Sequence, residues 1–155
     1  MRKQKSIGNK GFSLVELIIV IAIMAILVGV MAPQLLKYVE RTRVSSDTQL
    51  ADTVKTAVTT AILDPINMDD AAYQSAITTL SSGVTVNNIP APFMDDVAET
   101  LGISGSTISA TWASENLKSN NATNITVSLI GSNKVRVTVN GSHVDGASGT
   151  EIVVE

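Results

Sequence analysis

Cysteine is absent from the 155-residue chain, histidine occurs once, and aromatic side chains make up only 3%. Without cysteine the chain can form no disulfide, no thiol nucleophile and no cysteine-ligated metal site. The single histidine, His143, stands in a Gly/Ser-rich stretch with no plausible nucleophile or metal cluster near it, so we interpret it as a solvated loop residue. No phosphate-binding loop and no catalytic triad is recognisable. These absences argue against an enzyme, and we predict no metal site and no cofactor.

Acidic residues exceed basic ones, and the two signs are unevenly distributed. The chain has 11 basic and 14 acidic residues, for a net charge of −3. Four basic residues precede Phe12, where there is no acid: Arg2, Lys3, Lys5 and Lys10. The remainder therefore has 7 basic and 14 acidic residues, net −7. Such an acidic chain is a poor candidate for broad binding to nucleic-acid phosphates, and no specific nucleic-acid partner is predicted.

A long apolar run follows the basic leader. From Phe12 to Ala32 there are 21 residues, and Glu16 is the only charged one. A helix needs about 20 apolar residues to cross a bilayer, so this run is long enough to span one. Positive charge before the span keeps that end in the cytoplasm and sends the C-terminal part outside. Glu16 is the anomaly, because an ionisable group within a span is costly and suggests a function.

The residues leave several interpretations of this region open. An ordinary secretory signal has an apolar stretch of about 7–15 residues and a small-residue cleavage site. The run here is longer, and the only similar site, Val30-Met31-Ala32, is followed by Pro33, which normally blocks such a cut. A plain single-pass anchor explains the span but leaves Glu16 unexplained, unless its carboxylate simply snorkels to the interface. The remaining interpretation treats Glu16 as part of an assembly signal.

The junction Gly11-Phe12-Ser13-Leu14-Val15-Glu16 resembles the class III leader junction of type IV pilins and type II pseudopilins. The resemblance covers roughly residues 8–63, and Pro33 lies where many pilins have a helix-disturbing proline. It implies that a membrane prepilin peptidase cuts between Gly11 and Phe12 and methylates the new amine of Phe12. It also implies that Glu16 pairs with the N-terminal amine of a neighbouring subunit.

Elementary electrostatics agrees with that role for Glu16. A charge at the centre of a bilayer costs about 2.5–3.5 kcal/mol on insertion scales, and Glu16 should cost less because it lies nearer the cytoplasmic edge. In a filament the apolar helices exclude water, so the carboxylate needs a cationic partner. Because each helix must slide until its Glu16 meets an amine, the pair would also set the axial register between subunits.

The helix is expected to continue well beyond the apolar run. Gly29 and Pro33 predict a kink or local unwinding rather than an end. A stripe then advances by threes and fours, as expected for an amphipathic helix: Leu36, Val39, Arg43, Asp47, Leu50, Val54, Ala57 and Ala61. Asp64-Pro65 should stop the helix at about Leu63. A helix from Phe12 to Leu63 would be about 78 Å long, too long for the remaining residues to bury, so lipid or other subunits must cover its first half.

The rest of the chain predicts a small α+β head. Short helices are expected at 71–80 and 93–101, and strands at 84–89, 107–113, 125–130, 134–139 and 150–154. The expected product is the type IV pilin fold, in which a small antiparallel sheet packs on the second half of the long helix. The predicted boundaries are a leader at 1–11, an apolar helix half at 12–33, an amphipathic half at 34–63 and the head at 64–155. Without cysteines, the last strand should be held by sheet pairing and packing alone.

Other polar groups receive simpler interpretations. The loop from Asp145 to Glu151 has carboxylates, but its spacing matches no EF-hand calcium loop. The pairs Asp69-Asp70 and Asp95-Asp96 are interpreted as helix-start acids. Trp112 is interpreted as a core residue. Three N-glycosylation patterns, at Asn121, Asn124 and Asn140, are short enough to occur by chance.

Together these features predict a structural protein that performs no chemistry itself: a type IV pilin. It would be held in the cytoplasmic membrane by a single span with its head outside, in contact with lipid, and then be processed by the prepilin peptidase and methyltransferase. With the pilus assembly machinery it would polymerise with other pilin subunits into a surface filament for adhesion, twitching motility or biofilm formation. The nearest alternative is a pseudopilin of a type II secretion or DNA-uptake system. A more distant one is a membrane-anchored binding module.

Overall fold

The computed structural model describes residues 11–131, 134–141 and 151–155. Two compact units emerge, residues 1–38 and residues 39–155, and one helix runs from the first into the second. This helix, α1, comprises Leu14–Leu63, and its helical hydrogen bonding continues past Gly29 and Pro33. Neither residue ends the helix, as predicted, and the local unwinding that they suggested is not observed. The kink at Gly29 and Pro33 stays a prediction.

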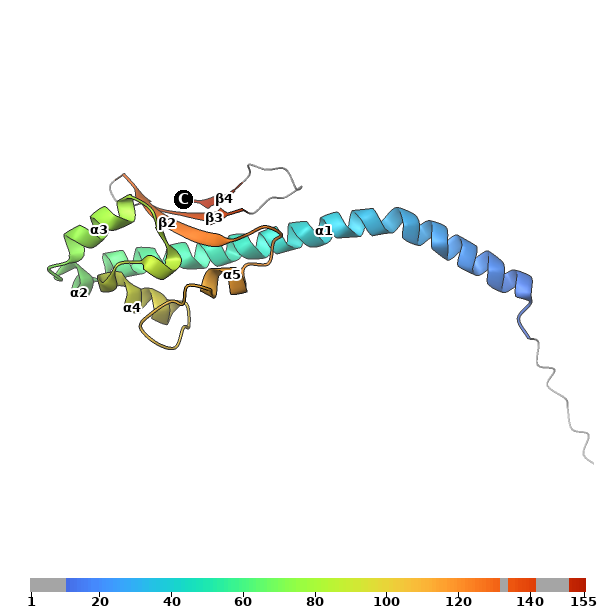
Figure 1. The fold of residues 1–155 in the computed structure, drawn as a ribbon, viewed down its shortest axis with the longest axis horizontal. Coiled ribbons are helices and arrows are strands. Elements are labelled where there is room, and N and C mark those ends of the chain that lie inside the picture. Colours follow the sequence, from blue (N-terminus) through green and yellow to red (C-terminus); the bar gives the residue numbers. More distant parts are fainter. Residues whose placement is uncertain (1–10, 132–133, 142–150) are drawn as a thin grey trace, which may run out of the picture. The chain divides into compact units, whose positions relative to one another are not determined.

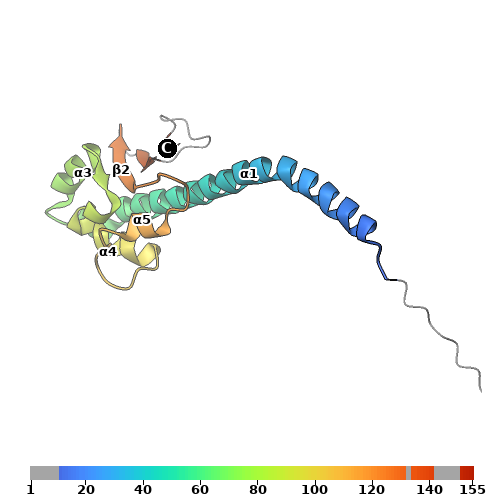
Figure 2. The same ribbon diagram turned by 45° about the vertical axis from the view of Figure 1, so that its right-hand side comes forward.

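The core of the second unit lies between α1 and a four-stranded antiparallel sheet (Figures 1 and 2). The strands are β1 (Val84–Thr85), β2 (Asn124–Ile130), β3 (Lys134–Asn140) and β4 (Ile152–Val154), in the spatial order β1-β2-β3-β4. From α1 the core receives a helical stripe of small and branched side chains: Val44, Ala51, Val54, Ala57, Val58, Ala61 and Ile62. Alternate residues of β2 and β3 face this stripe and are buried, as the two-residue period predicts. The predicted α+β arrangement is therefore confirmed.

Four short helices complete the head: α2 (Pro65–Met68), α3 (Tyr73–Ser81), α4 (Ala91–Thr100) and α5 (Trp112–Asn116). Asp64-Pro65 ends α1 as expected and also begins α2, because the Asp64 carboxylate accepts a hydrogen bond from the Ile66 amide at 2.8 Å. In the core the rings of Tyr73 and Phe93 meet edge to face, with centroids 5.6 Å apart. In both views α4 lies on the opposite side of α1 from the sheet (Figures 1 and 2), whereas α5 contacts β2.

Two predicted strands differ from the structure. Residues 84–89 form a two-residue strand followed by a 3-10 turn, Val86–Asn88. The expected strand at 107–113 is wrong, because its second half enters helix α5, where Trp112 lies half-buried against the core. The alternation around Ile108 and Trp112 reflects two separate core contacts, since Ile108 is also buried.

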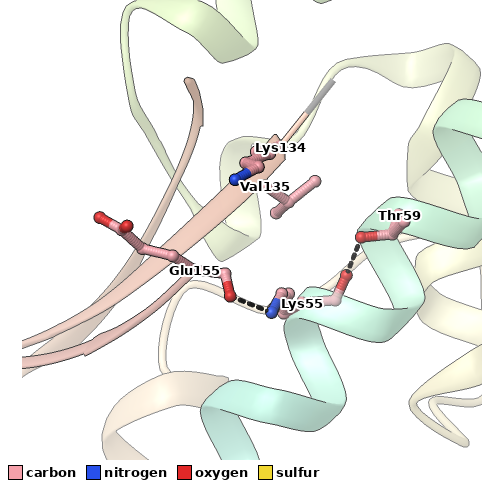
Figure 3. Close-up of a pocket in the computed structure, with 5 residues that line it drawn as sticks. All are labelled: Lys55, Thr59, Lys134, Val135 and Glu155. Carbon is pink, nitrogen blue, oxygen red and sulfur yellow. Dashed lines mark hydrogen bonds between the residues drawn. The ribbon is translucent and has the colours of Figure 1, made fainter. Parts of the chain in front are cut away.

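The last strand has polar attachments that sequence reasoning missed. Glu155 directly follows β4, and its main-chain oxygen accepts a hydrogen bond from the Lys55 ammonium of α1 (Figure 3). Its carboxylate pairs with Arg136 of β3. We call these two contacts the Glu155 clamp. Both partners of the ion pair are about half exposed, so the pair should contribute at most about 1 kcal/mol to stability. The strand is thus not held by pairing and packing alone.

Gly141, just after β3, is the most sensitive to substitution of the glycines that the structure describes. Its φ is +80°, and a Cβ there would lie 2.1 Å from the main-chain oxygen of Asn121. We expect Gly141→Ala to lower the free energy of unfolding by about 2 kcal/mol or more, from left-handed strain plus this clash. Urea unfolding in detergent, followed by circular dichroism, measures the loss. Gly131→Ala is the matched control, because Gly131 has a φ of +61° but open space around it. Equal losses in the two variants would contradict the clash.

Candidate processing and assembly site

The N-terminus of α1 has the sequence spacing of a capping box and its glutamate contact. Ser13 immediately precedes the first helical residue, and three residues later the Glu16 carboxylate reaches back and accepts the Ser13 amide proton at 2.9 Å. This contact satisfies one backbone donor that the helix cannot pair itself, and it places negative charge at the positive end of the helix dipole. Glu16 therefore has a partner within its own chain. The S-x-x-E spacing could have revealed this contact, and the sequence interpretation overlooked it.

The cut expected between Gly11 and Phe12 lies on exposed chain just before α1. Both residues are outside the helix, and the Phe12 side chain is 92% exposed. A Cβ added at Gly11 would meet nothing within 4 Å. The absence of a side chain at Gly11 is therefore not required by packing in the described part of the chain, so a recognition role remains open for it.

The apolar half of α1 is left uncovered by the chain. Every residue from Leu14 to Val39 is exposed, and the large apolar side chains along it are 38–72% exposed. In the described part of the chain, α1 is the only helix long and apolar enough to cross a membrane, and none of its most apolar 18-residue window is buried. An apolar surface of this size requires lipid or protein to cover it.

A second polar site lies on the amphipathic half of α1. Asp47 is fully buried. One carboxylate oxygen accepts the Lys118 amide at 2.8 Å, and the other accepts both the Ser119 amide, also at 2.8 Å, and the Ser119 hydroxyl. The burial is tolerated because three donors satisfy the carboxylate. Sequence analysis placed Asp47 on the helical stripe and did not identify this role.

One and two turns earlier on α1, Arg43 and Glu40 make two further contacts with the same loop. The Glu40 carboxylate accepts the Asn120 amide at 2.7 Å and pairs with Arg43 at 3.4 Å. Arg43 in turn donates to the Asn120 side chain at 3.4 Å. With Asp47, these residues form what we call the helix–loop clamp. It fixes the segment that leads from α5 into β2 against α1, and so positions the central strand pair.

The other candidate residues fall into three groups. His143 and the loop residues 145–150 lie outside the described residues, so the interpretation of that loop stays a prediction. Asp70 acts as expected, accepting the Ala72 amide at 2.6 Å just before α3. Asp95-Asp96 was wrongly placed at a helix start, because both residues lie within α4, where Asp96 accepts the Asn67 side-chain amide. No cluster of three or more potential metal ligands occurs among the residues that the structure describes.

Comparisons with known proteins match part of the chain. Residues 8–32 match the family described as the prokaryotic N-terminal methylation motif. The chain is 39% identical over 62 residues to a type IV major fimbrial protein FimA of Dichelobacter nodosus, an alignment that covers 40% of this chain and 39% of the relative. It is 47% identical over 53 residues to a fimbrial protein of Moraxella nonliquefaciens, covering 34% of each. It is 42% identical over 57 residues to a fimbrial protein of Pseudomonas aeruginosa, covering 37% of each.

These matches confirm the resemblance to type IV pilins that the junction suggested. They span only about a third to two fifths of each relative's length. No solved structure matches the chain.

Proposed function

We propose that this chain, whose N-terminal segment carries the type IV prepilin motif, is a structural subunit of type IV pili. In this proposal it waits in the cytoplasmic membrane with its head outside. A prepilin peptidase cuts it after Gly11 and methylates the amine of Phe12. The assembly machinery then polymerises it into a helical surface filament. Adhesion, motility or biofilm formation would be properties of that fibre.

The observation that carries the proposal is the uncovered apolar half of α1. Lipid can cover this surface while the subunit waits, and other copies of the same helix can cover it in a fibre. A binding module that needs only an anchor would have no reason to place Glu16 four residues after Phe12. That placement is explained if the new amine of one subunit becomes the partner of the carboxylate of the next.

The capping box supports this account of the waiting state. While the subunit is alone, Glu16 keeps a hydrogen bond to the Ser13 amide, which lowers the cost of holding a carboxylate near the membrane edge. Cleavage after Gly11 leaves both the Ser13 amide and the Glu16 carboxylate in the mature chain. Assembly then adds a cation where water is excluded, and an ionised carboxylate gains most from a cation under those conditions.

A pseudopilin of a secretion or DNA-uptake system is the second candidate, because it would share the junction, the helix and the processing. The two candidates differ in the abundance and length of the fibre. As a pilin the chain should be a dominant component of filaments sheared from the cell surface. As a pseudopilin it should be nearly absent from them while the processed chain is still present in the membrane.

Processing has its own test, intact-mass measurement of the membrane protein. We expect a chain that begins at Phe12 and carries one added methyl group. Gly11→Leu should remain at full length, because the peptidase would meet a bulky side chain at the cut, while a Cβ added at this position meets nothing within 4 Å in the structure. Circular dichroism of the variant controls for its folding. A wild-type mass beginning at Met1, or an unmethylated Phe12, would contradict the proposal.

A further inference from the structure

An apolar and acidic patch lies where α1 ends and α2 begins. Leu63, Ile66 and Met68 are 51%, 80% and 45% exposed, although each lies within a few residues of the core. Asp69 follows directly and is also exposed. We call these four residues the tip patch. Exposed large apolar side chains gathered in one short segment mark a candidate contact surface.

A patch of the opposite charge lies further back on α1. Val30, Pro33, Lys37 and Arg41 are spaced by three and four residues, so they share one face of the helix. All four are exposed, and Val30 is 60% exposed. We call them the neck patch. It combines two apolar side chains with two cations, whereas the tip patch combines three apolar side chains with a carboxylate.

We propose that the tip patch of one subunit packs on the neck patch of a second copy, an inference that rests on the proposed filament. Both patches contain exposed apolar side chains, and their charges are of opposite sign. Charge complementarity also favours this occupant over lipid, since an acidic tip is repelled by an anionic bilayer. The contact joins different surfaces of identical chains, so it repeats along a fibre without closing.

The positions of the two patches give the contact a measurable stagger. Arg41 and Leu63 are 22 residues apart on the continuous helix α1. At a rise of about 1.5 Å per residue, they lie about 33 Å apart along the helix. Subunits joined tip to neck must therefore be offset by about this distance along the fibre, with the head of the lower subunit beside the neck of the one above.

Disulfide trapping tests the contact, because the chain has no cysteine of its own. We introduce Gln34→Cys beside the neck patch and Ile66→Cys in the tip patch, in the full-length chain. Oxidised filaments should then yield a ladder of covalent multimers, since each subunit offers both partners. The matched control pairs Gln34→Cys with Ser104→Cys, an exposed position in the loop after α4, and should stay monomeric. Filaments that contain the double variant but give no ladder would overturn the tip-to-neck contact alone.

Charge reversal separates a protein contact from a lipid contact. Lys37→Glu with Arg41→Glu should reduce filament yield at least tenfold, and adding Asp69→Lys should restore most of it. If the cations instead served lipid headgroups, Asp69→Lys would give no rescue, and the inference would fail. The proposed filament fails separately, if the unaltered chain is missing from sheared surface fibres.

Discussion

Glu16→Ala is expected to reduce filament yield about a hundredfold or more, while the chain is still cut after Gly11 and remains in the membrane. In the proposed fibre this change leaves a neighbour's amine buried without a partner, which costs about 3–5 kcal/mol. Losing the contact to the Ser13 amide adds roughly 1 kcal/mol. Shearing and quantitative electron microscopy measure the filaments, and the membrane fraction measures processing.

Glu16→Gln separates the two roles of this side chain. A glutamine can still accept the Ser13 amide proton and keep the capping box, but it carries no charge. If pairing with the amine drives assembly, Glu16→Gln should fail nearly as completely as Glu16→Ala. Wild-type filament yield from the glutamine variant would show that the cap alone matters and would contradict the register argument.

Asp47→Ala is expected to lower the free energy of unfolding of the head by roughly 2–5 kcal/mol, the largest loss we predict for stability. The change removes the acceptor of three hydrogen bonds at a fully buried position and leaves the Lys118 and Ser119 amides without it. The loop that leads into β2 would then keep the contacts of Glu40 and Arg43 with Asn120. Thermal and urea unfolding in detergent measure the effect.

Two further variants define the cause of that loss. Asp52→Ala removes an exposed carboxylate from the same helix and should change stability by no more than about 0.5 kcal/mol. Asp47→Asn keeps one acceptor oxygen but turns an NH₂ donor toward the other amide. Its loss of stability should therefore fall between the losses of Asp47→Ala and Asp52→Ala. If Asp47→Ala were as stable as Asp52→Ala, the helix–loop clamp would have no role in holding the head together.

The sequence predicts the long helix and the central hairpin well, because both follow from local periodicity. The apolar run, the stripe after Leu36 and the alternation in β2 and β3 each have one dominant period. The strand expected at 107–113 failed for a related reason: two apolar residues four apart, Ile108 and Trp112, fit alternation as well as they fit a turn followed by a helix. The secondary structure of such short segments is decided by tertiary packing and not by the sequence pattern.

The candidate sites also differ in whether their residues are close in sequence or are brought together only by the fold. Gly11, Phe12 and Glu16 lie within one short stretch of sequence, so a junction motif could single them out. Asp47 and Lys118 are 71 residues apart, and only the fold brings them together. A charged residue on a mostly apolar helical stripe, a feature shared with Arg43, was the available signal for Asp47. The tip and neck patches could not be recognised at all until the exposure of each side chain was known.

The Glu155 clamp has a consequence for how the head completes its fold. A fold closed by a disulfide must wait for an oxidant and a thiol–disulfide exchange, which takes seconds to hours. Here the last strand is fastened by a lysine, an arginine and its own pairing, none of which needs an oxidant to form. The head can therefore mature without any redox enzyme, is indifferent to reductants, and responds instead to salt, which weakens such exposed charge contacts.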